Sequence, residues 1–383
     1  MPPKRRLLTP GPTAVPPEVL AALAEPVLHH RGPDFKEVFA RVRGRLREVF
    51  RTRNEVLVLT ASGSGAFESA VANLLSPGER VLVGTWGEFG ERWAKLAAAY
   101  GCEVHTLAYE WGETPSADDL AARLRATGAE VALLVHSETS TGVVADLESL
   151  AAACRETGAL AVVDAVSSLG AVPVETDAWG LDVVVTGSQK ALLCPPGLGF
   201  VSVSERALAK ARTATSPRFY WDWAGLLKAQ QEDTTRFTPA VATVVALDTA
   251  LGLLLDEGLE TAFARHVALG RACRAGAKAM GLELYSPDED RAAILTAILT
   301  PDGVDAVELR LALRDRHGIT IAGGHGEIAD RLFRIGHIGW VDVFDIATAL
   351  AAVELELVEA GADVERGVAV AAALDAYDAA VRL

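Results

Sequence analysis

The stretch Asp182-Val-Val-Val-Thr-Gly-Ser-Gln-Lys190-Ala-Leu-Leu-Cys-Pro-Pro-Gly197 decides the fold class of this chain. It opens with a run of β-branched residues, Val183 to Val185, which is typical of a parallel strand that is covered on both faces. Small residues end the strand, and Lys190 follows just beyond its carboxyl end, the edge at which open α/β sheets place their ligand sites. A lysine in a partly dry crevice loses basicity and can form a Schiff base with a carbonyl, although the position also fits a surface lysine in a loop.

Strand and helix patterns alternate around this stretch, from about residue 55 to residue 205. The predicted strands are Glu55–Thr60, Arg80–Gly84, Glu103–Leu107, Glu130–His136, Leu160–Asp164, Asp182–Thr186 and Gly199–Val203. Alanine-rich stretches with helical spacing lie between most of them, at Glu91–Tyr100, Ala117–Arg125 and Leu147–Glu156. The alternation predicts an α/β fold in which helices cover both faces of a mostly parallel, seven-stranded sheet. Right-handed crossovers then bring the loops after the strands to a common edge.

The pattern changes after about residue 250, where helices surround short strands. The predicted elements are helices at Gly258–Met280, Asp305–Arg316 and Val343–Glu359 and strands at Leu282–Tyr285, Ala292–Leu299 and Leu332–Ile335. We therefore predict an extended, proline-rich arm over residues 1–17, a large domain over residues 18–255 and a smaller C-terminal α+β domain over residues 256–383. The segment Arg206–Thr238 has weak periodicity and several aromatic residues, which predicts an irregular connection packed over the site or over a partner subunit.

Charge and cysteine content limit the function. The formal net charge of −15 argues against nucleic acid and anionic membranes as partners, and it leaves local dipoles to hold any phosphate. No apolar stretch is long enough to cross a bilayer and no signal-peptide pattern follows the basic N-terminus, so we predict a cytoplasmic protein. The spacing of Cys102, Cys154, Cys194 and Cys273 fits no zinc motif, which favours reduced thiols and no metal site, with only Cys194 close to Lys190.

The motif Thr60-Ala-Ser-Gly-Ser-Gly-Ala-Phe-Glu-Ser69 stands between an apolar strand and a helix-like run. Ser62, Gly63 and Ser64 would present N–H groups and hydroxyls at a helix N-terminus, an arrangement that binds phosphate without lysine or arginine. The motif matches neither the dinucleotide-binding pattern nor the P-loop. The alternative is a serine N-cap on an ordinary helix.

Two more motifs follow predicted strands. Asp164 ends one strand and therefore reaches the same crevice. There it could cap a helix, bind a metal ion or pair with a protonated ring nitrogen. The sequence offers no second and third metal ligand at a suitable spacing, which disfavours the metal site. The run His136-Ser-Glu-Thr-Ser-Thr-Gly142 follows another strand, and its hydroxyls could bond a ring substituent or form a polar turn.

Arg334, in Phe333-Arg-Ile-Gly-His-Ile-Gly339, lies inside an apolar strand pattern. A buried arginine is costly without an anion, and its planar fork matches a carboxylate, although an internal salt bridge would also satisfy it. Four of these motifs supply the parts of one site: Lys190 an amine, Asp164 a carboxylate, Ser62 to Ser64 a phosphate cradle and Arg334 a carboxylate clamp. These are the parts that pyridoxal 5'-phosphate and an amino acid require.

With these motifs in place, the chain resembles the class V aminotransferases of fold type I. It is most similar to alanine–glyoxylate and serine–glyoxylate aminotransferases, including the group labelled soluble hydrogenase small subunit. The resemblance runs from Leu7-Leu-Thr-Pro-Gly-Pro-Thr13 to Trp340, and Thr186-Gly-Ser-Gln-Lys190 departs from the family motif only in its first residue. It implies a homodimeric, pyridoxal 5'-phosphate-dependent transaminase with its sites at the subunit interface. Alanine or serine would donate the amino group to a 2-oxoacid such as glyoxylate or pyruvate, with ping-pong kinetics.

The resemblance also implies roles for individual residues. Lys190 would form the Schiff base and act as general base and acid, and Asp164 would pair with the pyridinium nitrogen. Further cofactor contacts are implied for Ser62, Gly63, Ser64 and Gln189 at the phosphate, Val166 at a ring face, Thr139 near the ring oxygen and Thr238 from the partner subunit. Arg334 would bind the substrate carboxylate, and Gly11 would line the site. The aromatic residue over the ring, often tryptophan in the family, is here Phe89, with Trp86 as the alternative.

Other activities remain open at this level. The donor could be a different amino acid such as aspartate, although no second cationic residue marks a dicarboxylic substrate. The chain could also be a non-enzymatic accessory subunit of a hydrogenase. A cysteine desulfurase shares the fold class, but the loop at residues 321–327, where its nucleophile would stand, has no cysteine. His29, His30 and Arg31 could reach the site from an N-terminal loop or could cap a helix.

Overall fold

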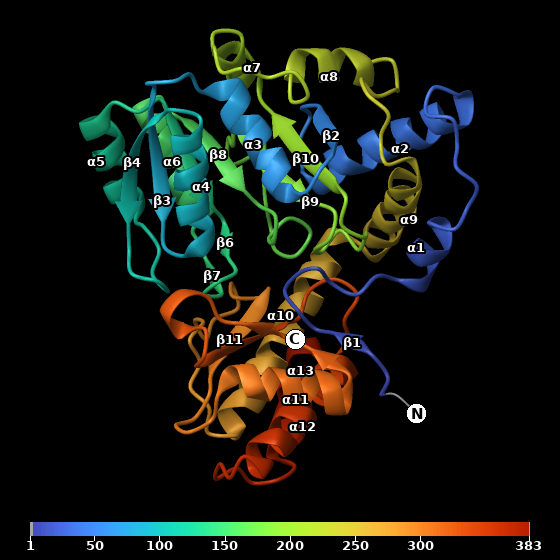
Figure 1. Cartoon of the computed structure of the whole chain (residues 1–383), viewed down its shortest axis with the longest axis vertical. Coiled ribbons are helices and arrows are strands. Elements are labelled where there is room, and N and C mark those ends of the chain that lie inside the picture. The colour runs from blue at the N-terminus through green and yellow to red at the C-terminus, as the bar shows by residue number, and fades with distance from the viewer. Residues whose placement is uncertain (1–2, 383) are drawn as a thin grey trace.

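Two sheets of different size organise the chain (Figure 1). The computed structural model describes residues 3–382, apart from the side chain of Glu327. The larger sheet has seven strands in the order β2-β10-β9-β8-β5-β3-β4. Their bounds are Val56–Thr60 (β2), Arg80–Thr85 (β3), Glu103–Ala108 (β4), Val131–Val135 (β5), Leu160–Asp164 (β8), Val183–Gly187 (β9) and Leu198–Val203 (β10). Only β10 runs antiparallel to its neighbours, so the predicted α/β fold with a mostly parallel sheet is confirmed.

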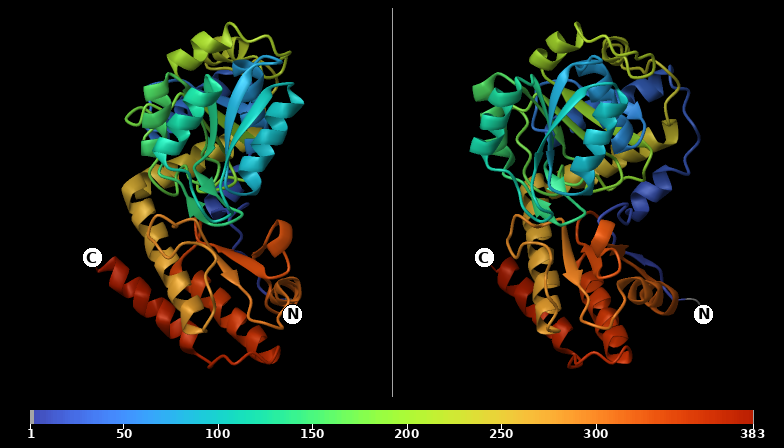
Figure 2. Two further views of the ribbon diagram at one scale, coloured as in Figure 1. Left: turned by 90° about the vertical axis from the view of Figure 1, so that its left-hand side faces the viewer. Right: turned by 60° about the vertical axis from the view of Figure 1, so that its left-hand side comes forward.

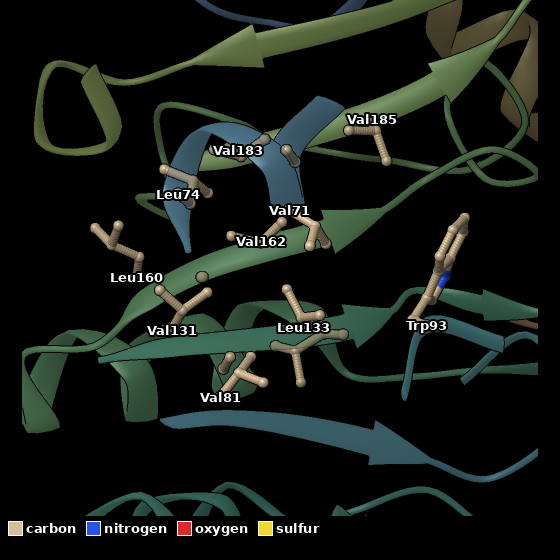
Figure 3. Packing of buried hydrophobic residues seen from close by; sticks show 14 of the residues in the cluster. Val71, Leu74, Val81, Trp93, Val131, Leu133, Leu160, Val162, Val183 and Val185 are labelled. Atoms are coloured by element: carbon tan, nitrogen blue, oxygen red, sulfur yellow. The ribbon is translucent and has the colours of Figure 1, made fainter. Parts of the chain in front are cut away.

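The larger sheet is covered on both faces, as the β-branched run in β9 predicts. Val183 and Val185 belong to one apolar cluster, whereas Val184 belongs to another. Figure 3 shows Val71 and Leu74 of helix α3 packing over the first face of the sheet. The helices of this part are α1 (Pro17–Ala22), α2 (Pro33–Val49), α3 (Gly63–Leu74), α4 (Glu88–Ala99), α5 (Ala117–Thr127), α6 (Leu147–Thr157), α7 (Glu205–Ala211), α8 (Trp223–Gln230) and α9 (Val241–Glu257). Helices α2 and α9 pack together against the second face.

The C-terminal part holds the smaller sheet, of three strands in the order β11-β14-β13 (Figure 2). Its elements are α10 (Leu259–Ala279), β11 (Leu295–Leu299), α11 (Ala306–His317), β12 (Ile319–Thr320), β13 (Ala322–Gly323), a 3-10 turn (Gly326–Ile328), β14 (Leu332–Gly336), α12 (Val343–Glu359) and α13 (Val368–Val381). Near the N-terminus, β1 (Arg6–Leu7) pairs in parallel with β12. The arm is thereby joined to the C-terminal part. A hairpin of β6 (Ser137–Glu138) and β7 (Val143–Val144) follows the carboxyl end of β5.

Some predicted elements differ from the structure. The predicted strand Leu282–Tyr285 reduces to one bridge between Leu284 and Ile298, and the predicted strand Ala292–Leu299 begins only at Leu295. The segment Arg206–Thr238 is not irregular throughout, because α7 reaches into it and α8 lies within it. Helix α9 escaped prediction because apolar residues surround most of its circumference, which leaves little amphipathic period to detect.

The limits of the predicted arm and of the two predicted domains stay predictions. Residues 1 and 2 of the arm, and the last residue of the small domain, lie outside the described part. No helix within residues 3–382 combines the length and the apolar character that crossing a membrane requires.

Candidate active site

Lys190 lies past the end of β9, under the N-terminal segment. Its Nζ donates a hydrogen bond to the carbonyl of Pro10 at 2.9 Å, and the Thr13 hydroxyl donates to the Lys190 carbonyl at 3.0 Å. A Cβ on Gly11 would stand 2.1 Å from the Lys190 Nζ, so only glycine lets the arm cross the amine at this distance. Burial lowers the pKa of Lys190 to about 8, and the guanidinium of Arg334 acts in the same direction. The amine is therefore prepared to lose its proton near neutral pH.

Asp164 ends β8, the strand next to β9. Its carboxylate accepts hydrogen bonds from the indole N–H of Trp93 at 2.7 Å and from the backbone N–H of Val166 at 2.9 Å. Burial raises the pKa of Asp164 to about 6, although both hydrogen bonds oppose that rise. Because this carboxylate is buried and oriented by two donors, it is suited to pairing with a cationic group of a ligand.

The N-terminus of α3 forms a third part of the site. Ser62 is the N-cap and accepts from the N–H of Gly65 at 3.4 Å, so the predicted capping role is present. The N–H groups of Gly63 and Ser64 have no acceptor among the described residues. The side-chain oxygen of Gln189 is buried without a partner there too. A Cβ on Gly187 would lie 2.7 Å from that oxygen and 3.3 Å from the Gly63 nitrogen, so the amide of Gln189 lies beside the open helix end.

These groups surround one cavity of ≈ 250 Å³. Its walls contain the predicted residues Gly11, Ser62, Gly63, Ser64, Phe89, Thr139, Asp164, Val166, Gln189 and Lys190, together with Pro12, Arg92, Trp93, Ser137, Ser167 and Pro196. Trp86, the alternative to Phe89, is fully buried and does not line the cavity. The structure therefore brings segments far apart in the sequence to a single site.

Arg334, on β14, lies directly behind the cavity wall. Its Nε donates to the carbonyl of Gly323 at 2.7 Å, its Nη1 donates to the carbonyl of Thr139, and its Nη2 lies 3.0 Å from Nε2 of His325. No carboxylate within 4.0 Å pairs with it among the described side chains, so the predicted alternative of an internal salt bridge is not found there. A guanidinium carries five N–H groups, and these contacts leave two of them for a ligand. Burial lowers the pKa of Arg334 to about 10, and Glu138 opposes this shift.

Thr238 does not line the cavity of its own chain. It is exposed on the loop before α9, near exposed Phe219 and Tyr220, and Tyr220 stacks on Phe237 with ring centroids 5.0 Å apart. Its predicted contact across a subunit interface therefore stays a prediction.

The N-terminal loop and the cysteines lie outside the site. His29, His30 and Arg31 line no part of the cavity, and the carbonyl of His30 accepts a hydrogen bond from the Thr234 hydroxyl at 3.2 Å. Cys194 is buried, and burial raises the pKa of its thiol to about 12, so it is no reactive thiolate.

Sequence reasoning missed Arg92, Trp93 and Glu138. Arg92 and Trp93 lie on α4 three and four residues after Phe89, the spacing that places side chains on one helical face. That spacing could have placed Arg92 and Trp93 at the site, whereas no signal in the sequence marked Glu138. Trp93 also stacks on Phe67 with a centroid distance of 3.6 Å, which fixes the indole that holds Asp164.

The chain is similar to known proteins over nearly its whole length. A family model described as aminotransferase class-V matches residues 6–333. The soluble hydrogenase 42 kDa subunit of Anabaena cylindrica is 44% identical over 362 residues, which are 94% of each chain. The ureidoglycine–glyoxylate aminotransferase of Bacillus subtilis superimposes with a TM-score of 0.95 at 33% identity, covering 99% of both chains.

Other relatives carry different donor names. The aspartate aminotransferase of subgroup IV from Thermus thermophilus has a TM-score of 0.85 and 41% identity, covering 92% of this chain and 99% of that one. Serine–glyoxylate aminotransferases of Methylorubrum extorquens and Arabidopsis thaliana are 34% and 33% identical.

Proposed function

The chain belongs to the class V aminotransferases and is a transaminase, and from that premise we propose that it uses pyridoxal 5'-phosphate to move an amino group from a small amino acid, alanine or serine, to a 2-oxoacid such as glyoxylate or pyruvate. One observation carries the proposal. A buried amine, a buried carboxylate and an open helix N-terminus face the same cavity, from Lys190, Asp164 and α3.

The residues present fit this cofactor. The N–H groups of Gly63 and Ser64 and the amide of Gln189 would hold the phosphate, and the positive end of the α3 dipole would favour its charge. The Asp164 carboxylate, oriented by the Trp93 indole N–H, would pair with the ring nitrogen. A carboxylate stabilises a cationic partner, so this nitrogen would stay protonated. Thr139, Val166 and Phe89 would bound the ring.

When bound, the pyridoxal group supplies an electrophilic carbon for the donor amine and a ring that accepts the electrons released at the donor Cα. Lys190 would hold the cofactor in the resting enzyme. Once displaced by the donor, its amine would take the proton from the Cα and deliver it on the cofactor side, as general base and then general acid. Arg334 would fix the donor carboxylate through its remaining N–H groups, which orients the Cα proton toward Lys190. The first oxoacid leaves before the second binds, so kinetics should be ping-pong.

We further propose a homodimer in which each subunit contributes Thr238 to the other's phosphate site. Exposed aromatic residues beside Thr238 support this, since Phe219 is 75% exposed and Tyr220 is 40% exposed. Trp221 also lies close to the helix that forms the cradle, because a Cβ on Gly65 would meet its ring at 3.2 Å. Apolar surface of this kind beside a site is typical of an interface.

Aspartate as the donor is the second candidate, and Arg92 favours it. Its guanidinium lines the cavity and lies over the Phe89 ring at 4.7 Å from the centroid, which gives a cation for a second carboxylate. The Thermus thermophilus relative carries that donor in its name. The hydrogenase name of the Anabaena cylindrica relative would add an accessory role, but it would not remove the catalytic groups.

A donor panel tests the proposal. The purified holoenzyme is mixed with alanine, serine or aspartate, with glyoxylate, pyruvate or 2-oxoglutarate as acceptor, and the cofactor absorbance and the product oxoacid are followed. We expect bleaching of the yellow band by alanine or serine alone and its recovery on adding glyoxylate. A preparation that binds no pyridoxal 5'-phosphate, or that no amino acid bleaches, would contradict the proposal.

A further inference from the structure

A buried carboxylate that this mechanism does not use joins two walls of the cavity. Glu138, on β6, is fully buried, and no lysine or arginine lies within 4.0 Å of it among the described side chains. Instead its Oε2 accepts from the N–H groups of Phe89 at 3.1 Å and Gly90 at 3.2 Å. Its Oε1 accepts from the N–H of Ser140 at 3.2 Å and from the Ser140 hydroxyl at 2.5 Å.

Glu138 and Ser140 together cap helix α4. The Ser140 hydroxyl accepts from the N–H of Glu88 at 3.2 Å, so the first three N–H groups of α4 all have partners from this one turn. The N-cap residue, Gly87, has no side chain to do this, and a Cβ there would lie 2.4 Å from Cγ of Glu138. A carboxylate at this end of a helix is favoured by the helix dipole and binds the orphan N–H groups.

Helix α4 supplies the wall of the cavity that would face the cofactor ring. Phe89 and Arg92 project from α4 into the cavity wall, and Trp93 on the next position donates to Asp164. The tilt and depth of the first turn of α4 set where these three side chains lie. Because Glu138 binds that turn directly, it controls their position.

The turn that contains Glu138 also contacts Arg334. Thr139, next to Glu138, lines the cavity, and its carbonyl accepts the hydrogen bond from Nη1 of Arg334. The negative charge of Glu138 also acts on Arg334, where it opposes the effect of burial on the pKa. One buried side chain is thus bonded to the helix that carries Phe89 and is adjacent to the carbonyl that holds Arg334.

We propose that Glu138 is a positioning residue that fixes the Phe89 ring and the Arg334 guanidinium relative to each other, so that the cofactor ring and the substrate carboxylate are held at the correct separation. The inference rests on the proposed function, since it assigns the two walls to those two ligands. It requires no contact between Glu138 and either ligand.

Glu138→Gln is the direct test, and Glu354→Gln is its matched control. Glu354, on α12, is buried and accepts from the N–H groups of Gly367 at 2.6 Å and Ala369 at 3.1 Å, at the start of α13 and away from the cavity. Both changes replace one acceptor oxygen of a buried, helix-capping glutamate by an amide N–H₂ group, so both should lower the melting temperature. Only Glu138→Gln should change the site.

For Glu138→Gln holoenzyme we expect KM for the amino donor to rise roughly 10- to 100-fold, with a smaller change in kcat. Independently of turnover, pyridoxal 5'-phosphate titrated onto the apoprotein should bind about tenfold more weakly, and its absorbance band should move. Glu354→Gln should leave KM, affinity and band unchanged. Equal KM values and equal bands in both variants, despite a lowered melting temperature, would show that Glu138 is only structural and would overturn the inference.

Ser140→Ala keeps the test valid if Glu138→Gln does not fold. It removes the hydroxyl between Glu88 and Glu138 but leaves the carboxylate, so the same shifts should appear at smaller size. An unchanged KM and an unchanged absorbance band in Ser140→Ala would overturn the inference. Wild-type enzyme that binds the cofactor but transaminates no donor would refute the proposed function instead. In that case the affinity and the absorbance band of the cofactor in the variants would still test whether Glu138 positions the ring.

Discussion

Helices α3 and α4 both begin at the wall of the same cavity, but one end is open and the other is filled. At α3 the N-cap Ser62 satisfies only the N–H of Gly65, and the two N–H groups before it are free within the described part of the chain. At α4 the N-cap is Gly87, and Glu138 and Ser140 occupy all of the first three N–H groups. The same backbone feature is therefore free to bind an anion in one place and is occupied by the chain's own side chains in the other. What decides between them is whether the chain itself supplies the carboxylate.

The largest expected effect comes from removing the Lys190 amine, which lines the same cavity as the two helix ends. Lys190→Ala should lower turnover by at least about 10²- to 10⁴-fold, because the general base and acid is lost. The open end of α3 should still hold the phosphate, so the cofactor should bind without the Schiff base that borohydride would reduce to a permanent link in wild type. Mass spectrometry after borohydride reduction and a steady-state assay measure both. Near wild-type turnover in this variant would refute the role of Lys190.

A carboxylate added at the N-terminus of α3 should occupy its free N–H groups, as Glu138 does at α4. Ser64→Asp places a carboxylate in the first turn of α3, where it should stabilise the apoprotein by about 0.3–1 kcal/mol through the helix dipole. The same charge should repel a phosphate and weaken pyridoxal 5'-phosphate binding roughly 10- to 100-fold. Urea unfolding and a cofactor titration measure the two effects, with Ser64→Asn as the neutral control. If Ser64→Asp and Ser64→Asn bind the cofactor equally well, the phosphate does not lie at this helix end.

A side chain added at Gly87, the N-cap of α4, should destabilise the protein. Gly87→Ala would bring a Cβ within 2.4 Å of Glu138 Cγ, and such overpacking costs about 1–3 kcal/mol. Gly44, in the middle of α2, has open space where an added methyl group would stand, with no atom within 4 Å, so Gly44→Ala should instead stabilise by roughly 0.5–1 kcal/mol. Urea denaturation of both apoproteins checks the opposite signs. A harmless Gly87→Ala would mean that Glu138 has room to move and holds α4 only loosely.

The smallest expected effect is the pH dependence of the rate at which the Lys190 amine reacts with the cofactor. The pKa of Lys190, lowered to about 8, means that the neutral nucleophile increases as pH rises toward 8 and then levels off. At pH 7 about one amine in ten would be neutral, so covalent incorporation of the cofactor should speed up about tenfold between pH 7 and the plateau. Stopped-flow absorbance on the apoprotein measures it. A rate that still climbs tenfold per pH unit between 9 and 10 would show an unperturbed lysine.

The parts of the site that carry unusual residues at strand ends were predictable. Asp164 ends the apolar strand β8 and Lys190 follows the apolar strand β9, and the pairing of these two strands brings the residues to one edge of the sheet. The arrangement follows from the geometry of parallel sheets, in which loops gather at one edge. Phe89 was found by resemblance, and the cavity wall includes it.

Glu138, the contact of Trp93 with Asp164 and the partners of Arg334 could not be predicted in the same way. Glu138 stands in a polar turn, and nothing in His136-Ser-Glu-Thr-Ser-Thr-Gly142 shows that its acceptors reach a helix about fifty positions earlier. Trp93 looks like any aromatic residue of an amphipathic helix until its indole is seen on Asp164. The carbonyls that hold Arg334 belong to the backbone, and backbone groups carry no side-chain signature. Contacts between distant segments, rather than residue type, decide these positions.

The N-terminal segment has a consequence for the order in which this protein is made. Its β1 pairs with β12, near the other end of the chain, and the carbonyl of Pro10 covers the Lys190 amine. Roughly 300 residues separate the two pairing strands, and at about 5–20 residues per second their synthesis takes about 15–60 s. Throughout that interval β1 has no strand to pair with. Residues of β1 are thus synthesised long before they find their place, and the Pro10 carbonyl can settle over the Lys190 amine only after β12 has been made.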